Sequence, residues 1–358
     1  MTDVRGLTAT QYGLMQLVYY WVVMLAEVPS GVFADRFGRR TTLALGAAVN
    51  GIGCWVFAIS HDLTTFAIGE VLFALGTAAI SGADSALLYD SLAADHREKD
   101  YPRAEGMGQA IWLILTAVGL PLTDLFLVRD GNPVLAYWIT GALSLGGVAF
   151  ALAMIEPPLK RTLSSREITL GAMRDVIRVP GLLRGIVYSI GLFMLLRAAI
   201  VTFLNPVLAD LGVPVNRFGL VLAVVNVVGA VSALLAHRVL DRHGYRVAMW
   251  IMPLSLVAMI ALLIPADQPI GASLFCIQGV VFGAYPLVVR SLLNRLAPSP
   301  ERRATVLSLE SMACRVSFGL LVVFSGWALD NHGLDWALAA TAALACVPFL
   351  VLPILRRG

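Results

Sequence analysis

The chain has 358 residues, of which 58% are hydrophobic and 14% are charged, and its mean hydropathy is +0.81. Soluble domains are about 45–50% apolar and about 25% charged, so the composition excludes an ordinary soluble protein and indicates that lipid surrounds most of the chain. The formal net charge is only +3, which gives no reason to expect a nucleic-acid partner. All four cysteines lie inside apolar runs without a CxxC pair, so we expect small core residues rather than a metal site or a disulfide framework: Cys54, Cys276, Cys314 and Cys346.

Eleven apolar runs are long enough to cross a membrane, since about 20 helical residues span about 30 Å of hydrocarbon. Lipid-exposed backbone must satisfy its own hydrogen bonds, and the ten-residue alternation of barrel strands is absent, so we expect helices. In chain order the predicted spans are residues 11–34, 41–60, 64–88, 105–128, 133–155, 185–209, 218–240, 247–266, 270–290, 304–328 and 335–355.

Basic residues separate the loops into two sets. One set holds nineteen of them and the other holds three, and basic loops remain in the cytoplasm. This asymmetry predicts a multi-pass plasma membrane protein, in a bacterium an inner membrane protein, with its C-terminus in the cytoplasm. With eleven spans, the N-terminus of this chain is then predicted outside.

The longest loop, residues 156–184, divides the chain into residues 1–155, with five spans, and residues 185–358, with six. Ser164 and Glu167 have the spacing of a capping box, and the apolar residues that follow recur at helical spacing as far as Pro180. We therefore expect a short amphipathic helix on the cytoplasmic face. Its basic residues could touch anionic lipid headgroups, or the loop could be a solvated linker.

A ten-residue loop, "GVFADRFGRR" at residues 31–40, joins the first two spans. Gly31 and Gly38 allow close packing and an unusual backbone angle where the chain turns sharply at the membrane surface. Asp35 carries the only negative charge of the loop, and three arginines hold the loop in the cytoplasm. An ordinary basic hairpin would require neither Asp35 nor both glycines.

This loop resembles the signature G-x-x-x-D-R-x-G-R-R/K of the major facilitator superfamily. The matching residues are Gly31, Asp35, Arg36, Gly38, Arg39 and Arg40. A second copy, "HRVLDRHGYR", follows 206 residues later and retains Asp241, Arg242, Gly244 and Arg246. This copy has diverged, because His237 stands at the position of Gly31 and Tyr245 at that of Arg39. The resemblance implies an all-α polytopic membrane protein of two pseudo-symmetric helical bundles, and in such transporters the substrate site lies near the membrane midplane.

The same offset aligns Gly212 and Gly219 with Gly6 and Gly13. The later stretch follows an apolar span, whereas the earlier one follows nothing. We therefore expect that the first of the family's twelve helices is missing from this chain. Either the start codon is placed too late, or the natural protein has eleven helices.

Ionisable side chains inside the predicted spans are candidates for function, because a charge in hydrocarbon needs a partner or water. Arg197 lies about 18 Å into its span, near the midplane, and Glu310 lies at a shallower position in span 304–328. The resemblance further implies cavity-lining helices that carry Glu70, Asp84, Arg197, Gln278 and Tyr285. Ordinary structural roles are also open. Asp84 and Asp90 could pair with loop arginines, and Gln278 and Tyr285 could form interhelical hydrogen bonds.

Two further expectations concern the predicted cytoplasmic side. The resemblance implies that Asp35 docks beside the N-terminus of span 304–328 as a conformational latch. The resemblance also implies that spans 11–34 and 304–328 face each other across the two halves. Glu27 and Arg315 lie at about 12 Å and about 17 Å from the cytoplasmic side, close enough for a pair. Alternatively, Glu27 could cap a kink at Pro29, and Arg315 could bind a backbone carbonyl or Glu310.

The predicted function is secondary transport of a small, amphipathic or drug-like solute by alternating access, with proton-coupled efflux as the default. Glu27, Glu70, Asp84 and Glu310 are the candidate proton carriers. No Walker loop, HExxH motif or Ser/His pairing is present, so we expect neither direct use of ATP nor an enzyme, and no cofactor. A monomer in the lipid bilayer is expected. Proton-coupled uptake of a nutrient and a non-transporting remnant of the family are the alternatives.

Overall fold

The computed structural model describes residues 8–97, 100–127, 134–157, 176, 178–267, 270–296 and 303–353, and within these ranges the regular structure is entirely helical. The chain divides into two compact units. The first comprises residues 1–112 and 122–162, and the second comprises residues 113–121 and 163–358. Each unit is described by itself below.

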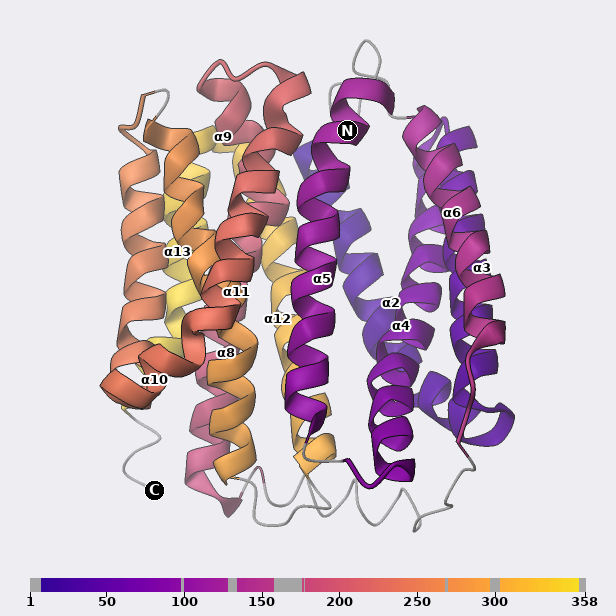
Figure 1. Ribbon diagram of the computed structural model, residues 1–358. Helices are drawn as coiled ribbons and strands as arrows, with labels where there is room; N and C mark the ends of the chain where they lie inside the picture. Colours follow the sequence, from indigo (N-terminus) through magenta and orange to yellow (C-terminus); the bar gives the residue numbers. More distant parts are fainter. Residues whose placement is uncertain are drawn as a thin grey trace. The chain divides into compact units, whose positions relative to one another are not determined.

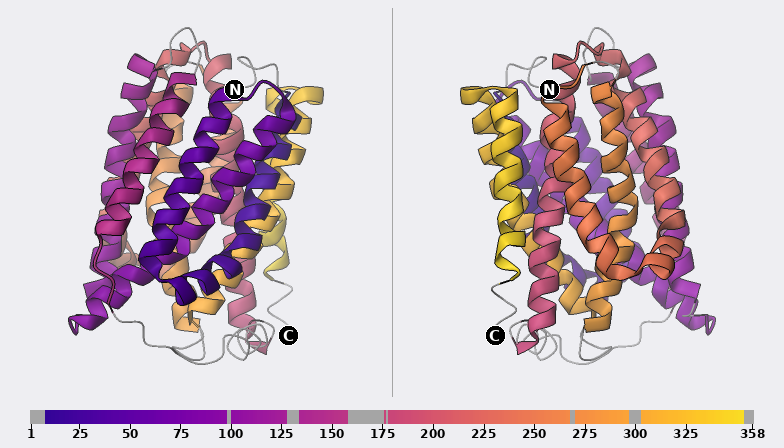
Figure 2. Two further views of the ribbon diagram at one scale, coloured as in Figure 1. Left: turned by 90° about the vertical axis from the view of Figure 1, so that its right-hand side faces the viewer. Right: turned by 90° about the vertical axis from the view of Figure 1, so that its left-hand side faces the viewer.

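The first unit is built on four helices, α2, α3, α4 and α6, that pack side by side (Figures 1 and 2). Helix α3 contacts both α4 and α6, and α2 contacts α4. The helices of this part of the chain are α2 (Ala9–Phe37), α3 (Arg39–Ile59), α4 (Leu63–Ala94), α5 (Tyr101–Leu122), the π-helical segment η2 (Thr123–Leu127) and α6 (Val134–Ala153).

The second unit is arranged around α8, which contacts α10, α11, α12 and α13. Its elements are α8 (Pro180–Arg197), the π-helical segment η3 (Ala198–Phe203), α9 (Leu204–Asp210), the 3₁₀ turn η4 (Val215–Arg217), α10 (Phe218–Leu263), α11 (Ile270–Leu296), α12 (Arg303–His332) and α13 (Leu334–Val351). Helix α10 also lies against α11, and α12 against α13 (Figure 1).

Every predicted span falls on a helix of the described chain. Among the described residues, eight helices are long and apolar enough to cross a membrane, and two shorter apolar helices cover residues 110–126 and 247–263. Helix α2 covers predicted span 11–34, but it is neither one of the eight membrane-length helices nor one of the two shorter apolar helices. Helix α8 begins at Pro180, before predicted span 185–209, and proline is favoured in the first turn of a helix. The predicted amphipathic helix falls mainly on residues 158–175, which lie outside the described residues.

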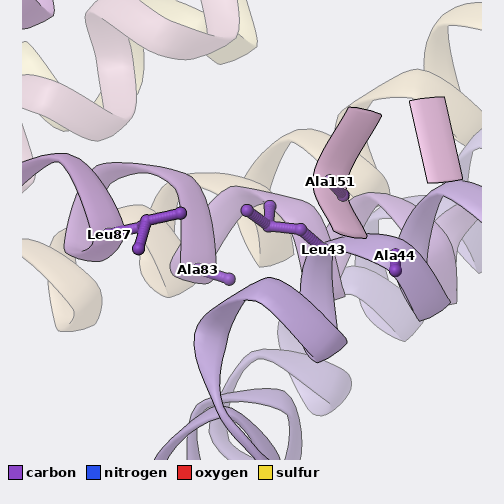
Figure 3. Close-up of a cluster of buried hydrophobic side chains, with 5 residues drawn as sticks. All are labelled: Leu43, Ala44, Ala83, Leu87 and Ala151. Atoms are coloured by element: carbon purple, nitrogen blue, oxygen red, sulfur yellow. The ribbon is translucent and has the colours of Figure 1, made fainter. Parts of the chain in front are cut away.

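Small residues let the helices of the first unit approach closely. A Cβ atom added to Gly76 of α4 would lie 2.7 Å from the carbonyl oxygen of Gly46 on α3, so a side chain there would separate the two helices. Next to this contact, α3, α4 and α6 share a cluster of buried apolar side chains (Figure 3). Its members are Leu43, Ala44, Ala83, Leu87 and Ala151.

Helix α4 begins with a side-chain cap. The carboxylate of Asp62 accepts hydrogen bonds from the backbone N–H groups of Thr64 and Thr65, each at 2.9 Å. These bonds satisfy two of the four donors that a helix leaves open at its N-terminus. The bond from the Thr65 backbone is the main reason why the pKa of Asp62 is lowered below its ordinary value.

Candidate functional site

The two copies of the loop share one unusual backbone conformation. Gly38, between α2 and α3, has φ 95° and ψ 149°, and Gly244, within α10, has φ 76° and ψ 165°. Other residues adopt positive φ only at a cost of about 1–2 kcal/mol, so glycine is favoured at both positions. The predicted backbone angle is thus confirmed at Gly38. Gly31, by contrast, lies inside α2, and a Cβ there would meet nothing within 4 Å.

An ion pair ties the signature loop to α4. The Nε atom of Arg39, the first residue of α3, lies 2.7 Å from Oδ2 of Asp90. The two side chains are 18% and 34% exposed, so water screens the pair only in part. One of the ordinary roles considered for Asp90, pairing with a loop arginine, is therefore confirmed.

A second carboxylate, which is distant in sequence but belongs to the same unit, binds the backbone of the signature loop. Glu156, three residues after α6, accepts hydrogen bonds from the backbone N–H groups of Arg39 and Arg40. It thereby caps the N-terminus of α3, where the helix dipole favours negative charge. A Cβ atom on Gly38 would lie 2.8 Å from Oε2 of Glu156, so a side chain there would displace this carboxylate. The carboxylate thus joins residues 117 positions apart in sequence.

The remaining residues of the two loop copies form fewer contacts, or their side chains lie outside the described part of the structure. The guanidinium of Arg36, an exposed residue, lies 5.3 Å from the centroid of the Phe37 ring. Arg40 donates from its side chain to the carbonyl oxygen of Met154 at 3.4 Å. In the second copy Arg242 is exposed. The side chains of three predicted site residues lie outside the described part of the structure: Asp35, Asp241 and Arg246.

A polar cluster in the second unit unites two predicted site residues. Tyr285 of α11 donates a hydrogen bond from its hydroxyl to Oε1 of Glu310 on α12 at 3.1 Å. The thiol of Cys314 donates to the same oxygen at 3.3 Å, and the hydroxyl of Ser189 on α8 also approaches this carboxylate. Glu310 is 7% exposed. The predicted interhelical hydrogen bond of Tyr285 is thus confirmed. Cys314 is a buried core residue, as predicted, and its thiol also contributes to this cluster.

Arg197 lies one helical turn after Phe193, whose ring packs against Tyr285 of this cluster. Its guanidinium carbon is 6.0 Å from the centroid of the Phe193 ring, and that ring packs against Tyr285 and Phe318. Immediately after Arg197 the helix changes to the π-helical segment η3. Such segments are rare and often lie at functional sites. The apolar periodicity of the sequence contains no sign of it.

Gln278 is completely buried on α11, and neither atom of its amide has a hydrogen-bond partner among the described residues. The predicted interhelical hydrogen bond is therefore absent for this residue in the described structure.

The other predicted site residues lie elsewhere in the two units. Glu70 is half-buried on α4 and Asp84 is exposed on the same helix, both in the first unit. Glu27 on α2 and Arg315 on α12 are both half-buried, and they belong to different units. Their predicted pairing therefore stays a prediction.

Apolar membrane-length helices in two units, each with the same glycine conformation in a repeated basic loop, define a polytopic membrane protein of the repeat type that transporters share. The chain matches the family model "Major Facilitator Superfamily" over residues 1–204 and 186–357, and it belongs to that family. The resemblance seen in the signature loop is thereby confirmed.

Relatives in this family are transporters. The chain is 25% identical to the inner membrane transport protein YajR of Escherichia coli over 349 residues, which cover 95% of this chain and 73% of YajR. It is 18% identical to the quinolone resistance protein NorA of Staphylococcus aureus over 159 residues, covering 44% of this chain and 39% of NorA.

Solved structures share the fold. A variant of the nucleoside transporter NupG superposes with a TM-score of 0.81 at 17% identity, covering 99% of this chain and 93% of that one. A bacterial homologue of the human lysosomal transporter Spinster superposes with a TM-score of 0.72 at 16% identity, covering 99% and 90% of the two chains.

Proposed function

We propose that this protein is a secondary active transporter that exports a small, amphipathic solute by alternating access, driven by a proton gradient. Membership of a transporter family supports the class of activity. The named relatives point in two directions, since NorA is a resistance protein and NupG a nucleoside transporter. Uptake is therefore the second candidate.

The observation that carries the proton-coupled part of the proposal is the buried carboxylate of Glu310. It joins α12 to α11 through the hydroxyl of Tyr285 and accepts a further bond from Cys314. Hydrogen bonds to an ionised acceptor are roughly twice as strong as those between neutral groups. Binding of a proton to Glu310 would thus weaken the contact between the two helices, and release of the proton would restore it.

Two arginines contribute to the electrostatics of this cluster. The positive charge of Arg290 on α11 favours the ionised form of Glu310, and that of Arg315 on α12 favours the ionised form of Cys314. The net charge of the cluster changes when Glu310 binds or releases a proton. This dependence provides a physical link between a proton and the packing of the second unit, as a proton-driven conformational cycle requires.

The signature loop supports the alternating-access part. Arg39 is held by Asp90 from its side chain and by Glu156 from its backbone, so the loop has a defined conformation within the first unit. We propose that Asp35, on the same loop, acts as the latch that stabilises one of the two states. Asp35→Asn is then expected to abolish transport while the protein still reaches the membrane.

The test uses the full chain in proteoliposomes with an imposed pH gradient and a panel of fluorescent lipophilic cations and neutral dyes. Glu310→Gln is expected to reduce gradient-driven flux at least tenfold, because the side chain keeps its shape but no longer binds a proton. Solute exchange without a gradient should continue in this variant. Glu105→Gln, on α5 outside the cluster, is the control and should behave like the parent.

Parent-level flux in Glu310→Gln under the gradient would contradict the assigned role of Glu310. The sign of the gradient that drives flux decides between export and uptake. Absence of flux for every solute, in parent protein with native secondary structure, would favour a non-transporting member of the family.

A further inference from the structure

Three buried polar side chains of the second unit have no hydrogen-bond partner among the described residues: Tyr188, Thr202 and Gln278. Two of them lie on segments that contact each other. One is the amide of Gln278 on α11, and the other is the hydroxyl of Thr202 in η3. Gln278 is 0% exposed and Thr202 is 7% exposed. Buried polar groups are nearly always hydrogen-bonded, because leaving a donor or acceptor unsatisfied is destabilising. Both groups therefore require an explanation.

Contacts on either side place these two residues at the same level of two facing helical segments. On one side the rings of Phe193 and Tyr285 pack together, with centroids 6.3 Å apart. On the other side Leu211, directly after α9, lies where a Cβ of Gly271 would meet it at 2.6 Å. The chain runs through η3 from 193 to 211 and along α11 from 285 back to 271.

Thr202 is the midpoint of the first stretch, and Gln278 is the midpoint of the second. The first stretch is four residues longer than the second, and the π-helical segment η3, which holds more residues per turn than an α-helix, accounts for part of this difference. Helix α11 also contacts η3 directly.

The direction of Gln278 follows from helix geometry. It precedes Tyr285 by seven residues, which brings the side chain back to within about 20° of the same face. Tyr285 points to Glu310 on α12 and to Phe193 on α8. The neighbouring Gly279 instead faces α10, where a Cβ would meet the carbonyl oxygen of Val225. Gln278 therefore faces the segment that contains Thr202 and not α10.

We infer that Gln278 and Thr202 form a binding subsite for a neutral group of the transported solute that both donates and accepts a hydrogen bond, such as a carboxamide. An amide side chain offers one of each kind, and a hydroxyl can serve as either. The charged groups of Arg197 and Glu310 lie at the level of Tyr285, since Arg197 packs on Phe193 and Glu310 accepts a hydrogen bond from Tyr285. A neutral group thus matches this level better than an ion does.

This inference rests on the proposed transport function and names the class of solute. In the present conformation the subsite is closed, because Gln278 has no exposed surface. The π-helical segment η3, which contains Thr202, provides a place where the subsite can open. Its i→i+5 hydrogen bonds can return to the α-helical pattern when neighbouring helices move.

The test measures the melting temperature of the purified full-length protein, so it does not depend on a transport assay. Gln278→Leu, which keeps the size of the side chain, is expected to raise the Tm by about 2–4 °C, because it removes an unsatisfied amide. Asn226→Leu is the matched control. Asn226 is also a buried amide, but it donates to the carbonyl oxygen of Leu222 at 2.8 Å, so its loss should lower the Tm.

Benzamide, benzoate and benzylamine at millimolar concentration then test the chemical class, because they share one ring and differ in their polar group. Benzamide alone should raise the Tm of the parent by about 2 °C or more. Gln278→Leu and Thr202→Val should each remove this rise.

A fall of the Tm in Gln278→Leu as large as that in Asn226→Leu would overturn the inference, since the amide would then already be satisfied, for example by water. Equal effects of the three compounds, or no effect of benzamide, would also overturn it. Flux that survives in Glu310→Gln would refute the proton role and leave this subsite intact. If benzamide does not raise the Tm of parent protein that still transports under the gradient, the subsite is refuted and the proton role of Glu310 is left intact.

Discussion

Glu156 is the residue that most clearly organises the signature loop. Its carboxylate lies at the positive end of the α3 dipole and accepts from two consecutive backbone N–H groups. The adjacent ion pair of Arg39 with Asp90 holds the side chain of the same residue whose backbone Glu156 binds. The side chains of Arg39, Asp90 and Glu156 together therefore hold the backbone turn between α2 and α3.

Removal of this cap should destabilise the first unit. Glu156→Ala deletes the acceptor of two N–H groups and is expected to lower the free energy of unfolding by about 1 kcal/mol. Glu156→Gln keeps an oxygen acceptor and should lose less. The Tm in detergent, followed by tryptophan fluorescence, measures both changes. An unchanged Tm in Glu156→Ala would show that the contact does not stabilise the unit.

Sequence reasoning found only part of this site, for identifiable reasons. Gly38 and Arg39 stand in a motif with fixed spacing, and Asp90 was one of two acids close enough to the basic loops. Glu156 lies more than a hundred residues away and follows an apolar run without any local pattern. Cys314 and Ser189 are small residues in apolar runs, where they resemble packing residues.

At the scale of helices, the repeated turn offers a matched comparison. Gly38→Ala and Gly244→Ala both force alanine into positive φ, which costs about 1–2 kcal/mol. Only at position 38 would the added methyl group also meet a side chain, the carboxylate of Glu156. Gly38→Ala should therefore lower the Tm more than Gly244→Ala does.

Gly31→Ala is the control for this comparison. It lies in helical backbone with open space around the Cβ position, so alanine there should be neutral or stabilising by about 0.5–1 kcal/mol. Equal losses at positions 38 and 244 would show that Glu156 moves aside without penalty.

The cap of α4 should make the start of that helix sensitive to acid. The pKa of Asp62 is lowered in the folded protein, mainly by the Thr65 backbone N–H, so its contribution to stability is present above the ordinary aspartate pKa. That contribution is lost as the pH falls through the lowered folded value. The protection of the amide protons of residues 63–66 against hydrogen exchange, relative to their intrinsic exchange rates, should therefore fall below about pH 4.

Asp62→Asn keeps an acceptor oxygen but does not titrate, so exchange in this variant should lack the acid-dependent step. The same step in both proteins would assign it to another carboxylate.

At the scale of the whole chain, the fold was predictable because long apolar runs have one solution in lipid, and the described residues of these runs are almost entirely helical. The 206-residue repeat was predictable from spacing, and the backbone angles of Gly38 and Gly244 agree with it. The π-helical segment η3 was not, because one additional residue in a turn barely changes an apolar pattern. The unsatisfied Gln278 was also unpredictable, since an amide within a span is normally bonded to a neighbouring helix.

The predicted pair of Glu27 and Arg315 would connect the two units in one conformational state. Glu27→Arg and Arg315→Glu should each impair transport at least fivefold, and the double variant should recover part of the loss, because opposite charges face each other again. Proteoliposome flux measures all three proteins. A double variant as inactive as the worse single one, without any crosslink between cysteines at positions 27 and 315, would exclude the pair.

The contact of Glu156 with α3 also has a consequence for biosynthesis. The N–H groups of Arg39 and Arg40 leave the ribosome 117 and 116 residues before the carboxylate that binds them. Three further helices, α4, α5 and α6, must be synthesised in between. The nascent first unit therefore holds its signature loop without this acceptor until residue 156 has emerged. A ribosome-bound chain that displays residues 1–153 should accordingly be cleaved by protease at the α2–α3 turn more readily than one that displays residues 1–157.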